Sequence, residues 1–513
     1  MAVPVWSVDP RTGKQREQVA TEATAQEVDA AVRAAAAALP ALADRSVRSR
    51  LLRGAAGLLE ESGERIIAAA DAETALGVPR LTGELARTAY QLRAFAEVVD
   101  EGGYLDVIID HADPDAKPLP RPDLRRFKIP LGVVAVYAAS NFPLAFSVPG
   151  GDTASALAAG CPVVVKAHPD HPATSELCAD VLRRAAVAAG LPADTVVLVH
   201  GFQAGVELVR HPLVSGAGFT GSIPGGRALF DAAAARPRPI PFHGELGSLN
   251  PVVVTEAAAA ERAEQIGAGL AGSFTLGNGQ FCTKPGLVLA PSGADGDRLV
   301  TALTEAASGA AAGVLLDSRM RDNFLKGAAA RTALPGVTAP VVPGDGGEHV
   351  VQPGFVTVEA ADLTEQGAYD LLLEECFGPL TVVVRYGSGD DLAAVLDRLP
   401  GNLTATAHLG ADEADQDGGQ AAALLARLTG LAGRVLVNGW PTGVAVAPAQ
   451  HHGGPYPATT STSTSVGGTA IERWLRPVAF QDTPPALLPP ELRDGNPLGV
   501  PRKVDGVREV PAS

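Results

Sequence analysis

Cys282 is the residue whose chemistry is hardest to explain as simple packing. It lies in GNGQFCTKPG, residues 277–286, among Gly, Asn, Gln, Thr and Pro, with few apolar neighbours that would bury it. A free cysteine is usually a small core hydrophobe. A cysteine in a polar turn is either an exposed bystander or an activated nucleophile, and this stretch alone leaves both readings open.

Two other polar residues follow short apolar runs, where strands of a sheet would end. Glu245 stands between glycines in PFHGELGSLNP, and Asn141 follows GVVAVYAA in AASNFPL. Ligands of open α/β sheets bind beyond the carboxyl ends of strands, and an amide placed there can donate to a developing oxyanion. The plainer alternatives are a solvated turn carboxylate for Glu245 and a helix cap or Asx turn for Asn141.

A third group of residues suits phosphate binding. The stretch FTGSIPGG offers Gly221 and Gly226 before a predicted helix, and a helix N-terminus favours anions. The stretch does not match GxGxxG, so it is a weak signal by itself. Lys166 ends the apolar run VVVK at another expected strand end, and it could equally be an ordinary solvated lysine.

These residues need a scaffold, and the apolar pattern predicts one. Residues 25–100 have apolar positions at helical spacing, and the Pro- and Asp-rich HADPDAKPLPRPD then predicts a loop or hairpin. Short continuous apolar runs such as PVVVKA and TVVLVH are typical of buried parallel strands. Because helices alternate with them, we predict a doubly wound domain at about 120–245.

A second α/β unit begins at NPVVVT and continues to RVLVNG. The run TTSTSTSVGG follows, and the aromatic residues that flank it favour an ordered surface loop over a flexible linker. A chain of 513 residues is too long for one core and indicates two to about four domains.

Composition excludes several function classes. With 41 basic against 57 acidic residues the formal net charge is −16, which argues against binding to nucleic acid or anionic membranes. Four cysteines without a CxxC pair, and no His cluster at ligand spacing, predict reduced thiols and no metal site. No signal core and no apolar run of about 20 residues is present, so we expect a cytoplasmic protein.

Together and in this order, the polar stretches resemble the aldehyde dehydrogenase superfamily over nearly the full length. The stretches that carry the resemblance are SNFPL, PVVVKAHPDHP, GFTGSIPGG, GELGSLNP, GQFCTKPG, EECFGPL and RVLVNGWPTG. A narrower resemblance is to the NADP-type branch that includes 2,5-dioxovalerate (α-ketoglutarate semialdehyde) dehydrogenases and a bacterial long-chain fatty aldehyde dehydrogenase. It is carried by GQFCTKPG, HGGPYPAT, GELARTAYQLRAFAE and the tail WLRPVAFQDTPPALLPPELRDGNPLGVPR.

The resemblance implies an architecture of two doubly wound α/β domains with a small oligomerisation hairpin and tail. We expect N-terminal helices, hairpin and NAD(P)-binding domain at 1–245, a catalytic domain at 246–445, and a return to the cofactor domain with the tail at 446–513. The family usually forms dimers or tetramers through a hairpin, here YLDVIIDHADPDAKPLPRPDLRRFKIP, and the C-terminal segment. A homodimer or homotetramer is therefore expected.

The resemblance also assigns roles to the candidate catalytic residues. Cys282 would attack an aldehyde carbon as a thiolate, and the side-chain amide of Asn141 and the backbone N–H of Cys282 would hold the oxyanion. Hydride would leave to the nicotinamide, and Glu245 would then activate the water that releases the acid.

Cofactor positions are implied motif by motif. They are Lys166 at the adenosine ribose, Gly221, Ser222 and Gly226 at the pyrophosphate, and Glu375 and Phe377 around the nicotinamide ribose. In NAD-preferring members an acidic residue often lies three positions after the lysine, where this chain has Pro169. Proline does not repel a 2′-phosphate, so NADP is expected over NAD, although VHGFQAGVELV offers no clear arginine for that phosphate.

The expected substrate is 2,5-dioxovalerate, which would be oxidised to 2-oxoglutarate. Its carboxylate needs a cation near the entrance, and Arg87 and Arg93 in the branch-like helix are the candidates, unless they are solvated face residues. A medium or long aliphatic aldehyde is the alternative. Glu245 argues against a CoA-acylating enzyme, because the hydrolytic branch needs this base. The paired GELG and FC motifs argue against an acyl-phosphate reductase. The presence of Asn141, Glu245 and Cys282 together argues against a non-enzymatic protein on this scaffold.

Overall fold

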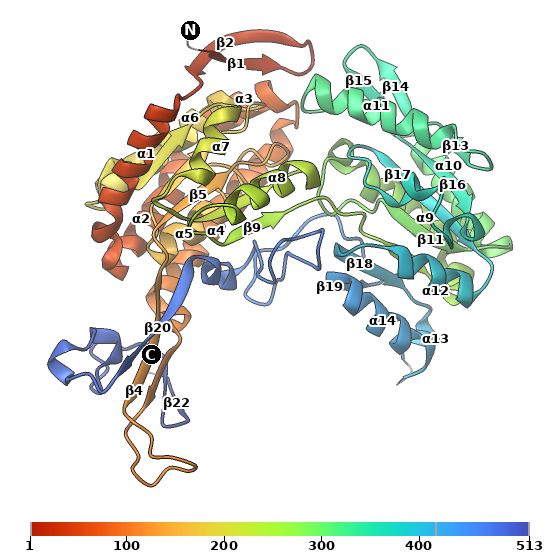
Figure 1. The fold of residues 1–513 in the computed structure, drawn as a ribbon. Coiled ribbons are helices and arrows are strands. Elements are labelled where there is room, and N and C mark those ends of the chain that lie inside the picture. The colour runs from red at the N-terminus through yellow and green to blue at the C-terminus, as the bar shows by residue number, and fades with distance from the viewer. Residues whose placement is uncertain (1–2, 416–417, 511–513) are drawn as a thin grey trace.

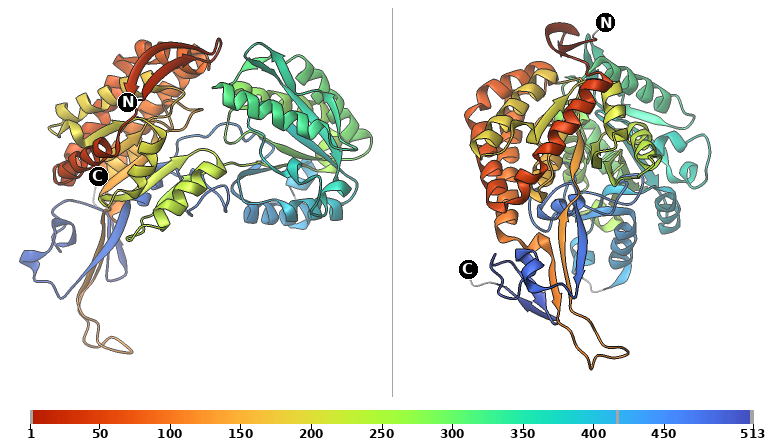
Figure 2. Two further views of the ribbon diagram at one scale, coloured as in Figure 1. Left: turned by 45° about the horizontal axis from the view of Figure 1, so that its top comes forward. Right: turned by 60° about the vertical axis from the view of Figure 1, so that its left-hand side comes forward.

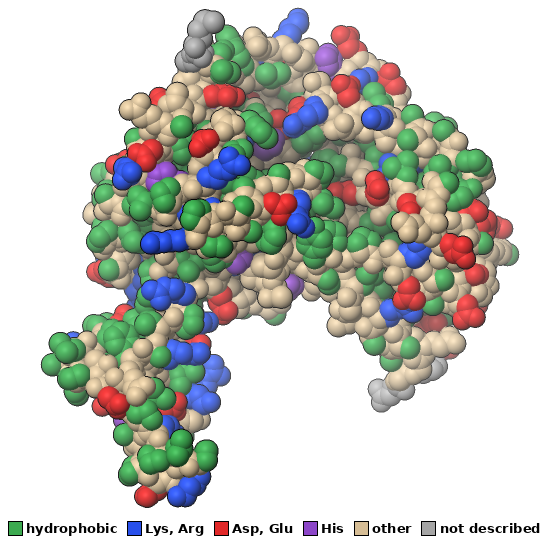
Figure 3. Space-filling model, in the orientation of Figure 1, with side chains coloured by type: hydrophobic (Ala, Val, Ile, Leu, Met, Phe, Trp, Pro, Cys, Tyr) green, Lys and Arg blue, Asp and Glu red, His purple; other side chains and the backbone are tan. Residues whose placement is uncertain are grey.

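Two sheet-containing parts lie side by side in the computed structural model, and a hairpin projects from one of them (Figure 1; Figure 2). The structure describes residues 3–415 and 418–510. Figure 3 shows the surface hollowed between the two parts. The residues predicted to do chemistry come from both parts, so this arrangement decides which of them meet.

The N-terminal region is a hairpin followed by helices, as the apolar spacing predicts for residues 25–100. Strand β1 (Pro4–Asp9) pairs antiparallel with β2 (Lys14–Thr21). The helices are α1 (Ala25–Ala38), α2 (Arg45–Glu61), α3 (Gly63–Thr74) and α4 (Val78–Glu101). The α4 helix buries one apolar face, and some of its polar side chains line the cavity described below.

The first large sheet has five parallel strands. They are β5 (Val133–Tyr137), β6 (Val163–Lys166), β7 (Val196–Val199), β8 (Val214–Thr220) and β9 (Phe242–Glu245), in the order β7-β6-β5-β8-β9. The connecting helices are α5 (Gly151–Ala159), α6 (Pro172–Ala188), α7 (Phe202–Arg210) and α8 (Ile223–Ala234). The predicted doubly wound α/β fold is confirmed.

The strand order reverses beside β5, which makes a topological switch point. Strands β6 and β7 lie on one side of β5, and β8 and β9 lie on the other. Such a reversal opens a crevice at the carboxyl ends of the strands, where ligands of open α/β sheets bind. Lys166 ends β6, Gly221 follows β8 and Glu245 ends β9, so all three lie along this edge.

The second large sheet has seven strands in the order β13-β16-β17-β11-β10-β18-β19, parallel except for β13. They are β10 (Val252–Val254), β11 (Leu287–Pro291), β13 (Thr338–Val341), β16 (Gly354–Glu359), β17 (Leu380–Tyr386), β18 (Asn402–His408) and β19 (Ala432–Val437). The helices are α9 (Glu256–Thr275), α10 (Ala294–Ser308), α11 (Ser318–Thr332), α12 (Gly389–Arg398), α13 (Ala411–Ala414) and α14 (Gly419–Leu431). A small antiparallel sheet joins β12 (Gly313–Val314), β15 (Val350–Gln352) and β14 (Gly344–Gly347).

The projecting part is a mixed sheet that joins distant stretches of the chain. Its strands are β3 (Val107–Asp110), β4 (Leu124–Pro130), β20 (Leu475–Gln481), β21 (Arg502–Val504) and β22 (Val507–Glu509), in the order β20-β4-β3-β21-β22. The hairpin predicted at HADPDAKPLPRPD is thus present between β3 and β4. Figure 1 shows this sheet extending away from the two main parts.

Each large sheet has buried apolar clusters of its own. Two clusters include strand residues of the first sheet, among them Val136 and Val164, and two others include strand residues of the second, among them Val253 and Val383. Over the described ranges, no helix combines the length and apolar character that crossing a membrane requires.

The run TTSTSTSVGG was predicted to be an ordered surface loop, but only part of it lies at the surface. Thr464, Ser465 and Val466 are 4%, 3% and 1% exposed. The run folds against the end of β9, where the N–H of Thr460 donates to the carbonyl of Gly244. Its hydroxyl groups find partners in the interior, so the polar composition does not require solvent.

Candidate active site

Cys282 lies at the tip of a loop between the short 3₁₀ helix η4 (Leu276–Gly279) and β11. Gly277 and Asn278 both have left-handed backbone conformations, with φ of 57° and 56°, which Gly and Asn tolerate best. A Cβ on Gly279 would lie 2.2 Å from the carbonyl oxygen of Gly378, so the two loops touch. The glycine-rich sequence around Cys282 is therefore required for this close approach.

Three side chains meet at the predicted nucleophile. The sulfur of Cys282, a carboxylate oxygen of Glu245 and a ring nitrogen of His452 all lie within 4.8 Å of one another. His452 Nε2 is 3.6 Å from Cys282 Sγ and 2.9 Å from Glu245 Oε1. The side chains of His452 and Glu245 are 0% and 1% exposed, so solvent does not screen this contact.

His452 is a candidate functional residue that the sequence reasoning missed. It is the first residue of HGGPYPAT, which was quoted for the family resemblance without any role for the histidine. The same segment holds Glu245 from behind, because the hydroxyl of Ser465 donates to Glu245 Oε2. A sequence signal was available in the alternating Thr and Ser residues at 459–465, which suit a segment that bonds inward.

The two ionisable groups that flank His452 are shifted in opposite directions. Burial raises the pKa of Glu245, but His452, the Ser465 hydroxyl and Arg473 outweigh it and leave that pKa below its usual value. Burial, followed by the charges of Glu245 and Glu375, raises the pKa of Cys282 well above the usual thiol value. The thiol therefore stays protonated at neutral pH until a base removes its proton.

Asn141 lies against the cysteine loop. Its side chain is buried, and its Nδ2 donates to the carbonyl of Gln280, 3.0 Å away. The α4 helix fixes this loop from the other side: Arg80 Nη2 donates to the Asn141 carbonyl at 2.6 Å. Glu84 Oε1 accepts the N–H groups of residues 144 and 145 at 2.8 and 2.9 Å. Asn141 is thus held beside Cys282 from two directions.

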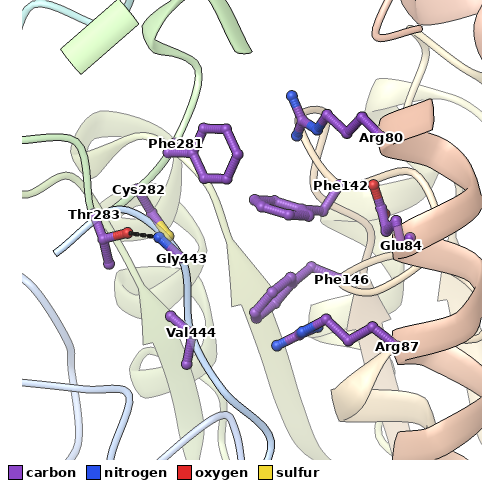
Figure 4. Close-up of a pocket in the computed structure, with 11 residues that line it drawn as sticks. Arg80, Glu84, Arg87, Phe142, Phe146, Phe281, Cys282, Thr283, Gly443 and Val444 are labelled. Atoms are coloured by element: carbon purple, nitrogen blue, oxygen red, sulfur yellow. Dashed lines mark hydrogen bonds between the residues drawn. The ribbon is translucent and has the colours of Figure 1, made fainter. Parts of the chain in front are cut away.

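A cavity of about 240 Å³ opens onto Cys282. Its walls come from α4, the loop after β5, the cysteine loop and residues 443–444, as Figure 4 shows. Phe142, Phe146 and Phe281 supply most of the apolar lining. The cavity can hold a small molecule with its reacting end at the sulfur.

Arg87 is the cation that faces this cavity close to the chemistry. Its guanidinium lies 5.3 Å from the ring centre of Phe146, whose ring centre is 6.0 Å from that of His452. Arg87 Nη1 is buried and has no hydrogen-bond partner among the residues that the structure describes. Arg80 also lines the cavity and lies over the rings of Phe142 and Phe281.

The structure does not bring Arg93 to the cavity, so its selection as a substrate residue was wrong. Arg93 pairs with Glu60 at 2.6 Å on the surface, where the two side chains are 43% and 44% exposed. Six residues of α-helix turn through about 600°, which places Arg93 on a different face of α4 from Arg87.

The predicted adenosine and pyrophosphate residues lie along the carboxyl edge of the first sheet. Lys166 is half-buried, and burial lowers the pKa of its amine against the opposing charges of Asp170 and Glu22. Ser222 caps α8 by accepting the N–H of Gly225 at 3.3 Å. The helix begins at Ile223, so Gly226 lies in its first turn and not before it as predicted.

Glu375 lies between the GELG motif and the cysteine loop. A Cβ on Gly247 would lie 2.5 Å from Glu375 Oε2, and the backbone of Ser248 bonds to this carboxyl group. Burial raises the pKa of Glu375 to about 7, against the opposing charge of Lys284. Phe377, two residues further on, is half-buried. The structure therefore brings Asn141, Glu245, Cys282 and Glu375 to one place.

Comparison with known proteins gives a consistent picture. Residues 4–456 match the model of a family described as the aldehyde dehydrogenase family. Alpha-ketoglutaric semialdehyde dehydrogenase 2 of Azospirillum brasilense is 48% identical over 472 residues, which cover 90% of this chain and 88% of that protein. Alpha-ketoglutaric semialdehyde dehydrogenase of Acinetobacter baylyi is 44% identical over 490 residues, with 95% and 92% covered.

Solved structures share the fold. A 3,6-anhydro-L-galactose dehydrogenase in complex with NAP superimposes with a TM-score of 0.77 at 23% identity, covering 94% of this chain and 96% of that one. An NADP-dependent enzyme of E. coli gives 0.77 at 25% identity, with 94% of each chain covered.

Proposed function

Because the chain belongs to the aldehyde dehydrogenase family, we propose that it oxidises 2,5-dioxovalerate (α-ketoglutarate semialdehyde) to 2-oxoglutarate. The two relatives named for alpha-ketoglutaric semialdehyde support this substrate. The observation that carries the chemistry is the constellation of Cys282, His452 and Glu245 beside a cavity that also presents Arg87. It supplies a nucleophile, two bases and an anion-binding group in one place.

The first half of the reaction needs a thiolate. His452 Nε2 lies 3.6 Å from the sulfur and 2.9 Å from Glu245 Oε1. It gives its own proton to Glu245, which releases it to solvent, and takes in its place the proton of Cys282, whose raised pKa would otherwise keep it a thiol. The sulfur then attacks the aldehyde carbon and forms a thiohemiacetal. Asn141 has a second N–H beyond the one bonded to Gln280, and this N–H, with the backbone N–H of Cys282, stabilises the oxyanion.

The second half of the reaction needs water and a base. NADP, when bound, would accept a hydride from the carbon held on Cys282 and so leave a thioester on the sulfur. Glu245, ionised because its pKa is held low, takes a proton from the attacking water. The thiolate leaves, the carboxylic acid departs as its anion, and Cys282 recovers its proton from His452.

Arg87 receives the substrate carboxylate in this proposal. Its guanidinium stays protonated at neutral pH, although burial lowers its pKa. A buried cation without a hydrogen-bond partner at Nη1 favours an anionic ligand over an apolar one. The phenylalanine rings of the same cavity suit the methylene groups between the aldehyde and the 2-oxo acid.

The cofactor site is formed by this chain's own residues at the sheet edge. Lys166 binds the adenosine ribose, and the α8 N-terminus with Ser222 receives the pyrophosphate. Gly226 lies in the first turn of this helix, and a Cβ there would lie 2.1 Å from Leu246 Cδ2, so a larger residue would displace that side chain. Glu375 and Phe377 hold the nicotinamide ribose.

NADP is the preferred dinucleotide in this proposal. Pro169 occupies the position where an acidic residue would repel a 2′-phosphate. The carboxyl group of Asp170 follows directly, and burial with the nearby Asp317 raises its pKa well above the usual value. This shift weakens the negative charge that Asp170 presents to a 2′-phosphate.

We propose that the chain divides by role as the sequence led us to expect. In this division residues 1–245 would bind the cofactor, 246–445 would carry the nucleophile, and the segment from 446 onward would belong to the first part and the tail. We propose that the sheet of β3, β4 and β20 to β22 mediates assembly into a homodimer or homotetramer. It projects from the rest of the chain and offers an open edge at β22.

The test is a panel of 2,5-dioxovalerate, succinate semialdehyde and hexanal, each assayed with NADP and NAD, with and without CoA. We expect the highest kcat/KM for 2,5-dioxovalerate with NADP, and a free acid as product. A preference for hexanal would favour the aliphatic alternative, which the three phenylalanines of the cavity suit. An acyl-CoA product, a higher kcat/KM with NAD, or no turnover would each contradict part of the proposal.

A further inference from the structure

Lys284 is a buried cation two residues after Cys282 that the chemistry above does not use. It is 2% exposed, although lysine is almost never fully buried without pairing. Its Nζ donates to the carbonyl oxygens of Cys376 and Leu380, both at 2.7 Å. Two of its three N–H groups thus bond to backbone oxygens of another loop.

Burial of this ammonium group is costly, so its presence requires an explanation. Burial lowers the pKa of Lys284 to about 8, although the nearby Cys376 and Glu375 oppose the shift. An apolar side chain of similar volume often packs at least as well as a buried charge. The lysine is therefore better explained by what its two hydrogen bonds hold than by stability alone.

The segment that these bonds hold has no regular structure of its own. Residues 374–379 connect the 3₁₀ helix η6 (Asp370–Leu373) to β17, and they include Glu375 and Phe377. Arg331 adds a further bond, from Nη2 to the Glu374 carbonyl at 2.8 Å. Lys284 bonds to the residue between Glu375 and Phe377 and to the first residue of the following strand.

The other end of Lys284 is tied to the nucleophile. Asn250 Nδ2 donates to the carbonyl of Cys282 at 2.8 Å and to that of Lys284 at 2.9 Å. One amide therefore fixes the backbone of both residues. The lysine side chain then spans from this fixed point to the segment of Glu375 and Phe377.

We propose that Lys284 is a positioning residue that sets the place of Glu375 and Phe377 relative to Cys282. A dinucleotide whose ribose is bound by these two residues is thereby held at the carbon attached to the sulfur. This inference rests on the proposed function for the role of Glu375 and Phe377. It adds a hydrogen-bonded link that sets the distance between the nucleophile and the residues that bind the hydride acceptor.

The test compares two reactions of the full-length protein. Hydrolysis of p-nitrophenyl acetate uses Cys282, the oxyanion donors and Glu245 but no dinucleotide, whereas oxidation of 2,5-dioxovalerate with NADP uses both loops. Lys284→Met keeps the length of the side chain and removes both hydrogen bonds. The control is Lys14→Met, because Lys14 is exposed on β2.

For Lys284→Met we expect ester hydrolysis within about twofold of wild type. We expect aldehyde oxidation to fall by about 10²-fold in kcat, the effect of misplacing reacting groups by about 1 Å. A deuterium isotope effect from the aldehyde hydrogen should appear or increase, and the Kd for NADP, measured by protein fluorescence, should rise. Lys14→Met should match wild type in every measurement.

Other outcomes overturn the inference. An equal loss of both reactions would show that Lys284 supports the loop of Cys282 and not the segment of Glu375 and Phe377. Unchanged aldehyde oxidation would show that Lys284 has no positioning role. Lys284→Gln provides a second, less apolar variant, and failure of both variants to fold would assign the residue to stability. If wild type oxidised no aldehyde, the proposed function would fail, and the dinucleotide Kd of wild type and Lys284→Met would still decide the inference.

Discussion

Replacement of Arg87 by methionine tests whether the cavity selects a carboxylated aldehyde. Within the described part of the chain, Arg87 Nη1 has no hydrogen-bond partner, and the guanidinium lies over the ring of Phe146. Methionine keeps an unbranched chain that can pack on this ring but removes the charge and its donors. The change therefore affects the anion contact more than the shape of the cavity.

The magnitude follows from that one contact. A hydrogen bond to a charged group contributes about 1.5–3 kcal/mol, and 1.36 kcal/mol corresponds to a tenfold change in rate. We therefore expect kcat/KM for 2,5-dioxovalerate to fall about 10- to 150-fold in Arg87→Met. Hexanal has no carboxylate, so its kcat/KM should change little.

The ratio of the two substrates isolates the carboxylate contact. Arg87 also lowers the pKa of Cys282 slightly, after the larger effects of burial and of Glu245 and Glu375, but this effect acts on both aldehydes equally. Steady-state assays with NADP at saturation give the two values. Arg93→Met is the matched control, because Arg93 pairs with Glu60 on the surface and should leave both values unchanged. Equal losses on both aldehydes, or none, would refute the reasoning.

Three further changes probe the reacting groups. Glu245→Gln should lower steady-state turnover about 10²- to 10⁴-fold but keep a first-turnover burst of NADPH, seen by rapid mixing; absence of the burst would place Glu245 before the thioester. His452→Gln should slow alkylation of Cys282 by iodoacetamide at pH 7, measured by mass spectrometry, and an unchanged rate would exclude His452 as its base. The raised pKa of Glu375, about 7, means that its carboxylate forms only as pH rises through that value, so KM for NADP should fall from pH 6 to 8. Folded protein binds the extra proton between the ordinary carboxyl pKa and about 7, so this group should lower the free energy of unfolding as pH rises over that window. Glu375→Gln should remove both dependences, and their persistence would assign them to another group.

The sheet-edge residues were predictable because parallel strands leave a strong pattern. Lys166 and Glu245 each end a short buried run, and strand ends of one parallel sheet share an edge. Cys282 was singled out by its polar setting, which the structure explains by the contact between two loops. In each case a short local pattern in the sequence was enough to indicate where the residue lies in the fold.

The residues that sequence reasoning misplaced or overlooked have separate physical causes. Arg93 does not reach the cavity because a helix turns about 100° per residue. A residue six positions after Arg87 therefore lies on a different face of the helix. His452 and the partly buried run at 459–468 lie in a segment without helical or strand period, so the alternating Thr and Ser residues were the main signal that this segment faces inward. Lys284 was noted only as part of a motif, because the sequence alone does not distinguish a buried lysine from a solvated one.

The distance in sequence between Cys282 and its neighbours has a consequence for the protein during its synthesis. His452 follows Cys282 by 170 residues, and Ser465 follows Glu245 by 220. A ribosome makes the thiol long before it makes the imidazole that would deprotonate it. In the growing chain Cys282 is thus an ordinary thiol, and it gains His452 as its base only when the late segment folds back over β9.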